Sequence, residues 1–300
     1  MPPRGSVTRP PAQIYGQHLG YGFAGLCVNV ATGNFTQMAV DLTFPGNLSG
    51  LLDWTRTYNS LSGAAAALGP GWTVAFSARL QVSEQGLLHQ TVGQVTFFDE
   101  DGRVLPFLPA EGGGFTSPQD LNATLTQNTD GGFDLTYLSG ETWSFTSAGQ
   151  LTGRSLEGQT VALTYAANGQ LLQASHSLGP HLGLSYDSSG RLTQVESSDG
   201  RAVSLGYAAD GTLASVTDPG GGVTQYGSTT TGPFPQVSSI TSADGNVVVT
   251  NTYDSATQQV TRQALPAGGG GVPGDPAPGV GHRCQRPVGG VPERHRAPVA

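Results

Sequence analysis

The stretch Tyr186-Asp-Ser-Ser-Gly190-Arg-Leu192 decides the fold, because closely similar stretches lie before and after it. They are Phe145-Thr-Ser-Ala-Gly149-Gln-Leu151, Tyr165-Ala-Ala-Asn-Gly169-Gln-Leu171 and Tyr207-Ala-Ala-Asp-Gly211-Thr-Leu213. The aromatic residues that open these stretches are spaced by 20, 21 and 21 positions. A second glycine series steps by 21 each time, at Gly158, Gly179, Gly200 and Gly221. Two features that recur in register indicate an internal repeat with two turns in each period.

Each period predicts two β-strands. Asn, Ser or Asp precedes the motif glycines Gly169, Gly190 and Gly211, and such pairs favour the positive φ angles of tight hairpin turns. The runs between the turns, such as Val161-Ala-Leu-Thr-Tyr165, alternate apolar with small or polar residues, which is typical of strands with one buried face. One hairpin cannot bury that face alone, so stacked repeats are expected to cover one another. Their tyrosines are expected to form a ladder on one face, at Tyr165, Tyr186 and Tyr207.

A helix is excluded, because glycine falls every ten residues or so and each would cost about 1 kcal/mol in a helix. The repeat extends beyond the four clear copies, upstream at Phe98-Asp-Glu-Asp-Gly102-Arg-Val104. Downstream, Tyr253-Asp-Ser-Ala-Thr257-Gln-Gln-Val260 has Thr257 where glycine is expected. The stretch from Tyr226 to Val237 breaks the period and is expected to be a loop or a degenerate unit.

The composition supports many short strands and excludes some functions. Glycine accounts for 45 of 300 residues and charged residues for 11%, against roughly 7% and 25% in average proteins. A net charge of −8 offers no basic surface for phosphate backbones, so no nucleic-acid partner is expected. No apolar run approaches the roughly 20 residues of a membrane helix, and no cleavable signal peptide is evident. These features leave the localisation open.

Candidate catalytic and metal-binding residues are sparse. The histidines are scattered, and only His176 and His181 are close in sequence. Neither has a cysteine or carboxylate at ligand spacing, and strand positions five apart point to opposite faces. The acidic run Asp99-Glu-Asp101 is expected to be a solvated turn rather than a calcium loop. With neither a Gly-x-Ser-x-Gly elbow nor a phosphate-binding loop, no enzyme activity and no cofactor are predicted.

Aromatic and arginine residues in the first half favour packing roles. The three tryptophans, Trp54, Trp72 and Trp143, are expected in the core, and a carbohydrate-binding surface is the alternative. Arg56 stands among apolar and polar neighbours, so it is expected to be partly buried and hydrogen-bonded.

The sequence also resembles a known family. The Tyr186–Leu192 motif resembles the YD repeat of RHS proteins. Four ordered upstream segments resemble the N-terminal conserved domain that precedes these repeats in bacterial RHS proteins: Val28-Asn-Val-Ala-Thr-Gly-Asn34, Asp41-Leu-Thr-Phe-Pro-Gly46, Arg56-Thr-Tyr-Asn-Ser60 and Leu68-Gly-Pro-Gly-Trp72. The domain motif is carried by Gly33, Arg56, Tyr58, Asn59, Gly69, Gly71 and Trp72. The repeat motif is carried by Tyr165, Gly169, Leu171, Tyr186, Asp187, Gly190, Arg191, Leu192, Tyr207, Gly211 and Leu213.

This resemblance implies a fold and a role. RHS repeats build a β-sheet strip that coils into a hollow shell, and in polymorphic toxins the shell encloses a C-terminal effector used against competing bacteria. The implied partners are the rest of the shell, a toxin domain and secretion machinery, and the implied location is secreted or at the cell surface. The chain has five or six repeat-like units and neither the self-cleaving core segment nor a toxin domain, so it is interpreted as the first portion of such a protein. A cell-surface adhesion or carbohydrate-binding module is the alternative.

The predicted fold is an all-β antiparallel hairpin-repeat sheet with a disordered tail. The expected divisions are a flexible segment over 1–25, an RHS-associated N-terminal β-domain over 26–110, a YD/RHS repeat sheet continuous with it over 111–262, and a tail over 263–300. The tail from residue 264 holds nine glycines and seven prolines and no aromatic residue, a composition that cannot bury a core. A frameshift near codon 264 and a genuine flexible linker both account for it. A disulfide between Cys27 and Cys284 is possible but not favoured.

Overall fold

The computed structural model describes residues 23–24, 27–44, 48, 50–63, 67–85, 91–119 and 121–266, and within them it contains strands and turns but no helix. The predicted all-β class is confirmed. In this part of the chain there is accordingly no helix long and apolar enough to cross a membrane. Most of the predicted N-terminal segment and tail, with Cys284, lies outside the described residues.

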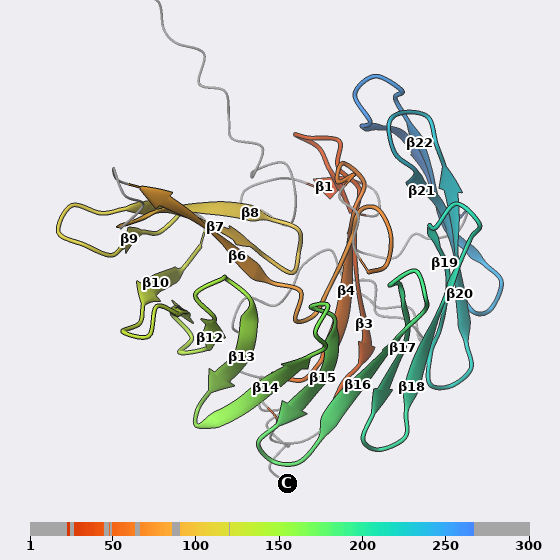
Figure 1. Ribbon diagram of the computed structural model, residues 1–300. Helices are drawn as coiled ribbons and strands as arrows, with labels where there is room; N and C mark the ends of the chain where they lie inside the picture. Colours follow the sequence, from red (N-terminus) through yellow and green to blue (C-terminus); the bar gives the residue numbers. More distant parts are fainter. Residues whose placement is uncertain are drawn as a thin grey trace, which may run out of the picture.

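Fourteen consecutive strands form one antiparallel sheet in which each strand pairs with its neighbours in sequence. We call this sheet the strip. It curves through a wide arc, from β13 and β14 below to β21 and β22 at the right of the view (Figure 1). Its strands are β10 (Ala123–Gln127), β11 (Phe133–Tyr137), β12 (Thr142–Phe145), β13 (Leu151–Leu156), β14 (Gln159–Tyr165), β15 (Leu171–His176), β16 (His181–Tyr186), β17 (Leu192–Ser197), β18 (Ala202–Tyr207), β19 (Leu213–Thr217), β20 (Val223–Thr229), β21 (Gln236–Thr241), β22 (Val247–Tyr253) and β23 (Val260–Ala264).

The first part of the chain forms three smaller sheets, which we call the N-terminal sheets. They stand on the inner side of the arc (Figure 1). Their strands are β1 (Phe23–Ala24) with β2 (Val28–Asn29); β3 (Thr36–Leu42), β4 (Trp54–Asn59) and β5 (Trp72–Val74); and β6 (Arg79–Gln85), β7 (Thr91–Phe98), β8 (Val104–Pro109) and β9 (Phe115–Thr116).

The N-terminal sheets share no strand pairing with the strip among the described residues. The burial of β4 explains the separation: all but one of its positions are buried, so this strand is covered on both faces, as strands of an internal layer are. The strip wraps around that layer instead of extending from it.

Strands of the strip bury alternate residues, as the sequence pattern predicts. In β16, Leu182 and Leu184 are buried while the residues between and after them are partly or fully exposed. Across the neighbouring strands the same inner face carries Val195, Val203 and Leu205. These side chains join one core with those of the N-terminal sheets.

The motif turns have a recurring bulge. At the turn after Tyr186, Gly190 has a φ of 81°, and its N–H donates to the carbonyl of Asp187 over 3.0 Å. The pairing register of β16 with β17 shifts by one residue between Ser185 and Tyr186. The same shift precedes the motif aromatic residue in β12, β14, β18 and β22, whereas the hairpins closed by the second glycine series from Gly158 to Gly221 have none. A bulge bends its strand and re-aims a side chain.

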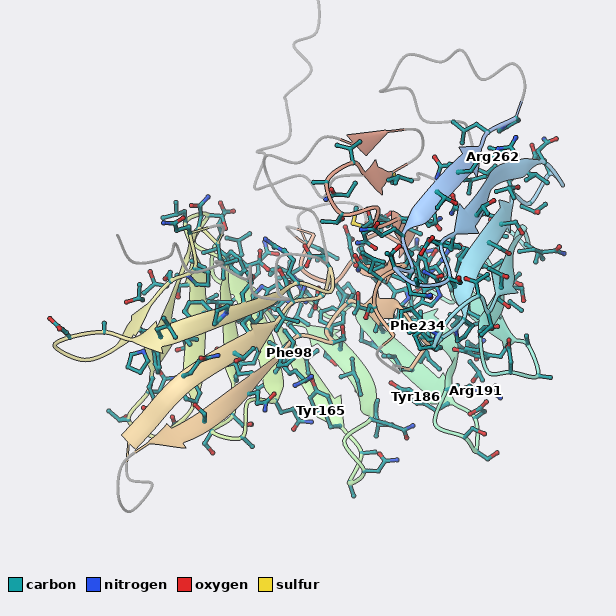
Figure 2. The ribbon with its side chains drawn as sticks, turned by 90° about the horizontal axis from the view of Figure 1, so that it is seen from above. Phe98, Tyr165, Tyr186, Arg191, Phe234 and Arg262 are labelled. Atoms are coloured by element: carbon teal, nitrogen blue, oxygen red, sulfur yellow. The ribbon has the colours of Figure 1, made fainter. Side chains whose placement is uncertain are left out.

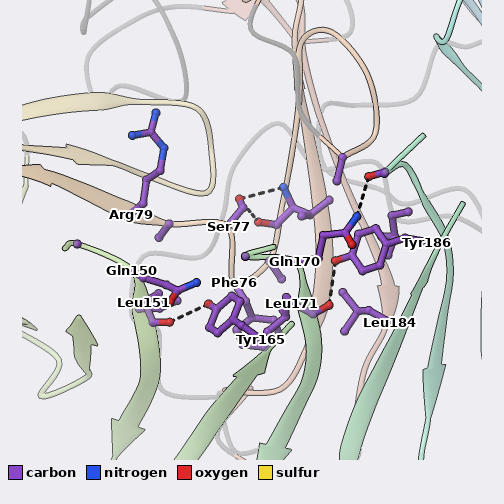
Figure 3. Close-up of a pocket in the computed structure, with 18 of the residues that line it drawn as sticks. Phe76, Ser77, Arg79, Gln150, Leu151, Tyr165, Gln170, Leu171, Leu184 and Tyr186 are labelled. Atoms are coloured by element: carbon purple, nitrogen blue, oxygen red, sulfur yellow. Dashed lines mark hydrogen bonds between the residues drawn. The ribbon is translucent and has the colours of Figure 1, made fainter. Parts of the chain in front are cut away.

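The re-aimed tyrosines link successive repeats. Tyr165 donates its hydroxyl hydrogen bond to the carbonyl of Leu151 over 2.7 Å, and Tyr186 donates to Leu171 over 2.9 Å. Tyr207 donates to Leu192 over 2.6 Å. Each acceptor is the leucine that ends the preceding motif, so each repeat is tied backward to the one before it. Tyr165 and Tyr186 follow one another along the strip (Figure 2), and Figure 3 shows their two bonds in close-up.

Two irregular repeats keep the hairpin form. The stretch from Tyr226 to Val237 forms the β20–β21 hairpin with a longer connection, so it is a degenerate unit of the strip. In the turn after Tyr253 the left-handed residue is Gln258, with a φ of 62°, one position after Thr257, which aligns with the motif glycine. This turn is one residue longer than the others, which moves the left-handed position by one.

Removing one ladder hydroxyl should destabilise the strip measurably. Tyr186→Phe deletes the donor to Leu171 and keeps the ring, so we expect the free energy of unfolding to fall by about 1 kcal/mol. Urea unfolding followed by circular dichroism measures this change. An unchanged unfolding midpoint would mean that the ladder bond contributes nothing to the native state.

The ladder also makes stability depend on alkaline pH. Burial raises the pKa of Tyr165 and of Tyr186 to about 12, from an ordinary 10.0. The folded state therefore favours the neutral phenol, so this stabilisation is complete below pH 10 and is lost as the pH rises to about 12. Unfolding free energies measured across that window should fall with pH, and less steeply in Tyr186→Phe. Equal slopes in the two proteins would contradict the assignment.

Candidate functional site at the interface of the N-terminal sheets and the strip

A buried arginine joins the N-terminal sheets to the strip. Arg56 on β4 is 1% exposed. Its Nε and Nη2 donate to the carboxylate of Asp41 over 2.7 and 3.1 Å. Its Nη1 donates to the hydroxyl of Tyr226 on β20 over 2.6 Å, and its guanidinium lies 5.4 Å from the ring centre of Trp72. We call Asp41, Arg56, Trp72 and Tyr226 the Arg56 cluster.

Electrostatics hold the Arg56 cluster together. Burial disfavours the charged guanidinium, but the carboxylate of Asp41 and the hydrogen bonds outweigh it, and the pKa of Arg56 stays above its ordinary value. Burial also raises the pKa of Tyr226, so its phenol is neutral and accepts from Arg56. The aromatic rings of Trp72 and Tyr226 meet edge to face at 5.3 Å, a favoured aromatic geometry.

Next to the Arg56 cluster, Tyr58 and Ser60 reach the following strand of the strip. The hydroxyl of Tyr58 accepts from the backbone N–H of Val237 over 2.9 Å. The amide of Gln236 donates to the carbonyl of Ser60 over 2.7 Å. Because these groups are buried, each bond satisfies a polar atom that would otherwise be costly to leave unpaired.

Two motif glycines allow close contact between backbones. A Cβ on Gly69 would lie 2.9 Å from the carbonyl oxygen of Gly211, and one on Gly33 would lie 2.7 Å from Cβ of Gln259. Both glycines also have positive φ angles, 90° and 68°. Any larger residue there would push the strip away from the N-terminal sheets. The carbonyl of Gly33 also accepts a hydrogen bond from the N–H of Val260 over 2.9 Å.

Further bonds follow the same rim of the strip. The N–H of Leu80 donates to the carbonyl of Gly149 over 2.8 Å. The carbonyl of Ala67 accepts from the N–H of Leu192 over 3.0 Å and from the hydroxyl of Tyr207 over 3.1 Å. The rim formed by the motif turns, which we call the motif rim, is therefore fastened to the N-terminal sheets at intervals along the arc.

The acidic run at residues 99–101 is not a solvated turn, so that expectation was wrong. Asp99 and Glu100 are each 6% exposed. Glu100 accepts from the N–H of Phe76 and pairs with the guanidinium of Arg154 on β13. That guanidinium also lies 4.1 Å from the ring centre of Trp143. Glu100 thus forms a buried ion pair between the N-terminal sheets and the strip. The sequence does not reveal it, because the arginine partner lies 54 positions away.

The remaining residues singled out in the sequence pack in the core or bond to neighbouring turns. Trp54, Trp72 and Trp143 are each at most 2% exposed, so none lines an open surface. Asn59 donates to the carbonyl of Asp101 over 2.8 Å, and Gly71 lies against the ring of Tyr58. In the clearest repeat, Asp187 and Arg191 form an ion pair of 2.7 Å across the turn.

Histidines and acidic residues gather into no metal site in this part of the chain. No group of three or more His, Cys, Asp or Glu side chains among the described residues is placed to hold an ion. His176 is buried, and its Nδ1 accepts from the N–H of Leu178 over 3.1 Å. His181 lies on the next strand of the strip, β16.

Comparison with known proteins gives one family and several structures. The family described as "Domain of unknown function (DUF6531)" matches residues 25–107. No curated protein matches the chain. The crystal structure of TcdB2-TccC3 without its hypervariable C-terminal region is 16% identical over 66% of this chain and 11% of that chain, with a TM-score of 0.30. The crystal structure of TcdB2-TccC3-Cdc42 is 19% identical over 76% of this chain and 12% of that one, with a TM-score of 0.25. That of TcdB2-TccC3-TEV is 16% identical over 79% and 14%, with a TM-score of 0.28.

The chain thus spans between 11% and 14% of the length of these solved chains. The DUF6531 match lies over the N-terminal sheets, and the strip follows it in sequence. This order of an N-terminal domain and an antiparallel hairpin-repeat sheet fits an RHS/YD-type chain.

Breaking the Arg56 cluster should loosen the whole interface. Arg56→Met keeps most of the volume but leaves the carboxylate of Asp41 buried without its partner, so we expect a loss of about 3–5 kcal/mol in the free energy of unfolding. Chemical unfolding measures it. The matched control is Arg201→Met, which removes the partly exposed pair with Asp199 and should cost at most about 1 kcal/mol. Equal losses in the two variants would show that burial of the pair is unimportant.

Proposed function

We propose that this chain is a structural scaffold of an RHS-repeat protein, and that it forms part of a β-shell enclosing a C-terminal toxin used in competition between bacteria. The observation that carries the proposal is the fastening of the motif rim to the N-terminal sheets. A container made from a strip needs a closed end, and a layer of sheets bound along one rim of a curved strip supplies it.

The bonds along the motif rim suit a permanent closure. Beside them lie two buried ion pairs: Arg154 with Glu100, which joins the strip to the N-terminal sheets, and Arg56 with Asp41, which lies within the N-terminal sheets and holds Arg56 against Tyr226. Breaking one member of such a pair is strongly destabilising. The partners of the proposed scaffold are further repeats, a toxin domain and secretion machinery. Its proposed location is outside the producing cell or at the cell surface.

Protease protection in the full product of the native gene tests this proposal. In the wild-type protein we expect the polypeptide that follows the strip to resist an added protease. In Arg56→Met the rim is loosened and the same polypeptide should be cut faster, whereas Arg201→Met should behave as the wild type. Quantitative mass spectrometry of the released peptides measures the rates.

Equal cleavage in wild type and Arg56→Met would contradict an enclosing role. The adhesion alternative predicts instead that the purified chain binds cell-surface polysaccharide, which a polysaccharide array detects. Saturable binding to such an array, together with unprotected downstream polypeptide, would favour adhesion over encapsulation.

A further inference from the structure

Cys27 begins a tight hairpin that lies beside the end of the strip. Its carbonyl accepts from the N–H of Thr36 over 2.9 Å, and within the hairpin the N–H of Gly33 donates to the carbonyl of Asn29 over 2.8 Å. The carbonyl of Gly33 in turn accepts from the N–H of Val260 on β23. The last strand of the strip is therefore bonded to the same short hairpin that carries Cys27.

The side chain of Cys27 is buried, and its sulfur is not a free thiol. The residue is 2% exposed. No cysteine among the described residues is free, and Cys27 is disulfide-bonded. Its φ is 59°, a left-handed conformation that residues other than glycine, asparagine and aspartate rarely adopt. Cysteine thus occupies this position at a cost in backbone conformation, which favours a role for its sulfur.

The chain offers one partner for this sulfur. The sequence has two cysteines, and the second, Cys284, lies outside the described residues. Cys284 follows Val260 by 24 positions, and a chain of that length spans up to about 80 Å. Because Val260 is already held beside Gly33, Cys284 can reach Cys27 without any rearrangement of the strip.

We propose that Cys27 and Cys284 form a disulfide that ties the polypeptide after the strip back to the N-terminal sheets, although the sequence alone did not favour this pair. As the S–S bond forms, the S–S bond of a disulfide-bearing oxidant breaks and takes up the two hydrogen atoms and two electrons as a pair of thiols. Disulfides persist in oxidising surroundings and are reduced in the cytosol, so the tether is closed outside the cell. This inference concerns the covalent structure of the chain and does not depend on the proposed scaffold function.

Peptide mapping of the full chain tests the pairing. The chain is purified without reductant and denatured in the presence of an alkylating agent, which traps any free thiol. We expect a cross-linked species that joins the peptide of Cys27 to the peptide of Cys284 and that disappears after treatment with dithiothreitol. In Cys284→Ser, Cys27 should be recovered alkylated. Alkylation of both cysteines in the wild type, or a link between the Cys27 residues of two chains, would overturn the proposal.

Unfolding separates a native tether from accidental oxidation. Cys284 follows Cys27 by 257 positions, all of which the bond closes into a loop in the unfolded chain, whereas in the folded chain only the 24 positions after Val260 remain to be closed. Since the entropic cost of a loop grows with the logarithm of its length, dithiothreitol should raise the unfolding equilibrium constant of the wild type roughly 30-fold.

The matched control for this effect is Cys284→Ser, whose unfolding equilibrium constant dithiothreitol should leave unchanged. Urea unfolding followed by tryptophan fluorescence measures both proteins with and without the reductant. An equal response of the two proteins, or no response of the wild type, would show that the bond is not part of the native fold.

Discussion

The burial of one guanidinium constrains how the strip and the N-terminal sheets fit together. Arg56 sits where water cannot reach it, so its charge must be met by protein groups. Asp41 supplies the counter-charge from the adjacent strand, and Tyr226 supplies the last acceptor from 170 positions away. The strip can deliver that hydroxyl only by curving around the N-terminal sheets. The curvature of the strip brings β20 back to β4, where the hydroxyl of Tyr226 completes the hydrogen bonding of Arg56.

The strip meets this requirement because its two rims differ. Bulges occur on the strands that enter the motif turns and are missing from the hairpins of the second glycine series, so bending and added twist accumulate on one rim. The same bulge turns each motif tyrosine toward the repeat before it, as at Tyr186. Curvature and cohesion thus come from one irregularity, repeated once in every period.

Much of the fold was predictable from the spacing of glycines and aromatic residues, because turn chemistry and strand alternation are local properties. The carbonyl groups that accept the tyrosine hydroxyls were not predictable, since they depend on a bulge that shifts the strand pairing by one residue. The burial of Glu100 was missed for a similar reason: its run of three acidic residues is typical of an exposed turn, and only tertiary contact with Arg154 explains it. Arg56 was expected to be partly buried and hydrogen-bonded, and it is fully buried. Its partner Tyr226 could not be foreseen, because it lies in the stretch where the period breaks.

The fastening of the motif rim also limits how the gene can change. A duplicated 21-residue unit adds two strands, and strands lie about 4.8 Å apart, so it displaces everything beyond it by about 10 Å along the sheet. Such a duplication upstream of Tyr226 would carry that hydroxyl out of reach of Arg56, whereas one beyond Ala264, the last residue of β23, would leave the bonds of Tyr226 and Val260 to the N-terminal sheets in place. Copy number is therefore constrained for the repeats that lie against the N-terminal sheets, and unequal recombination within that stretch should be selected against.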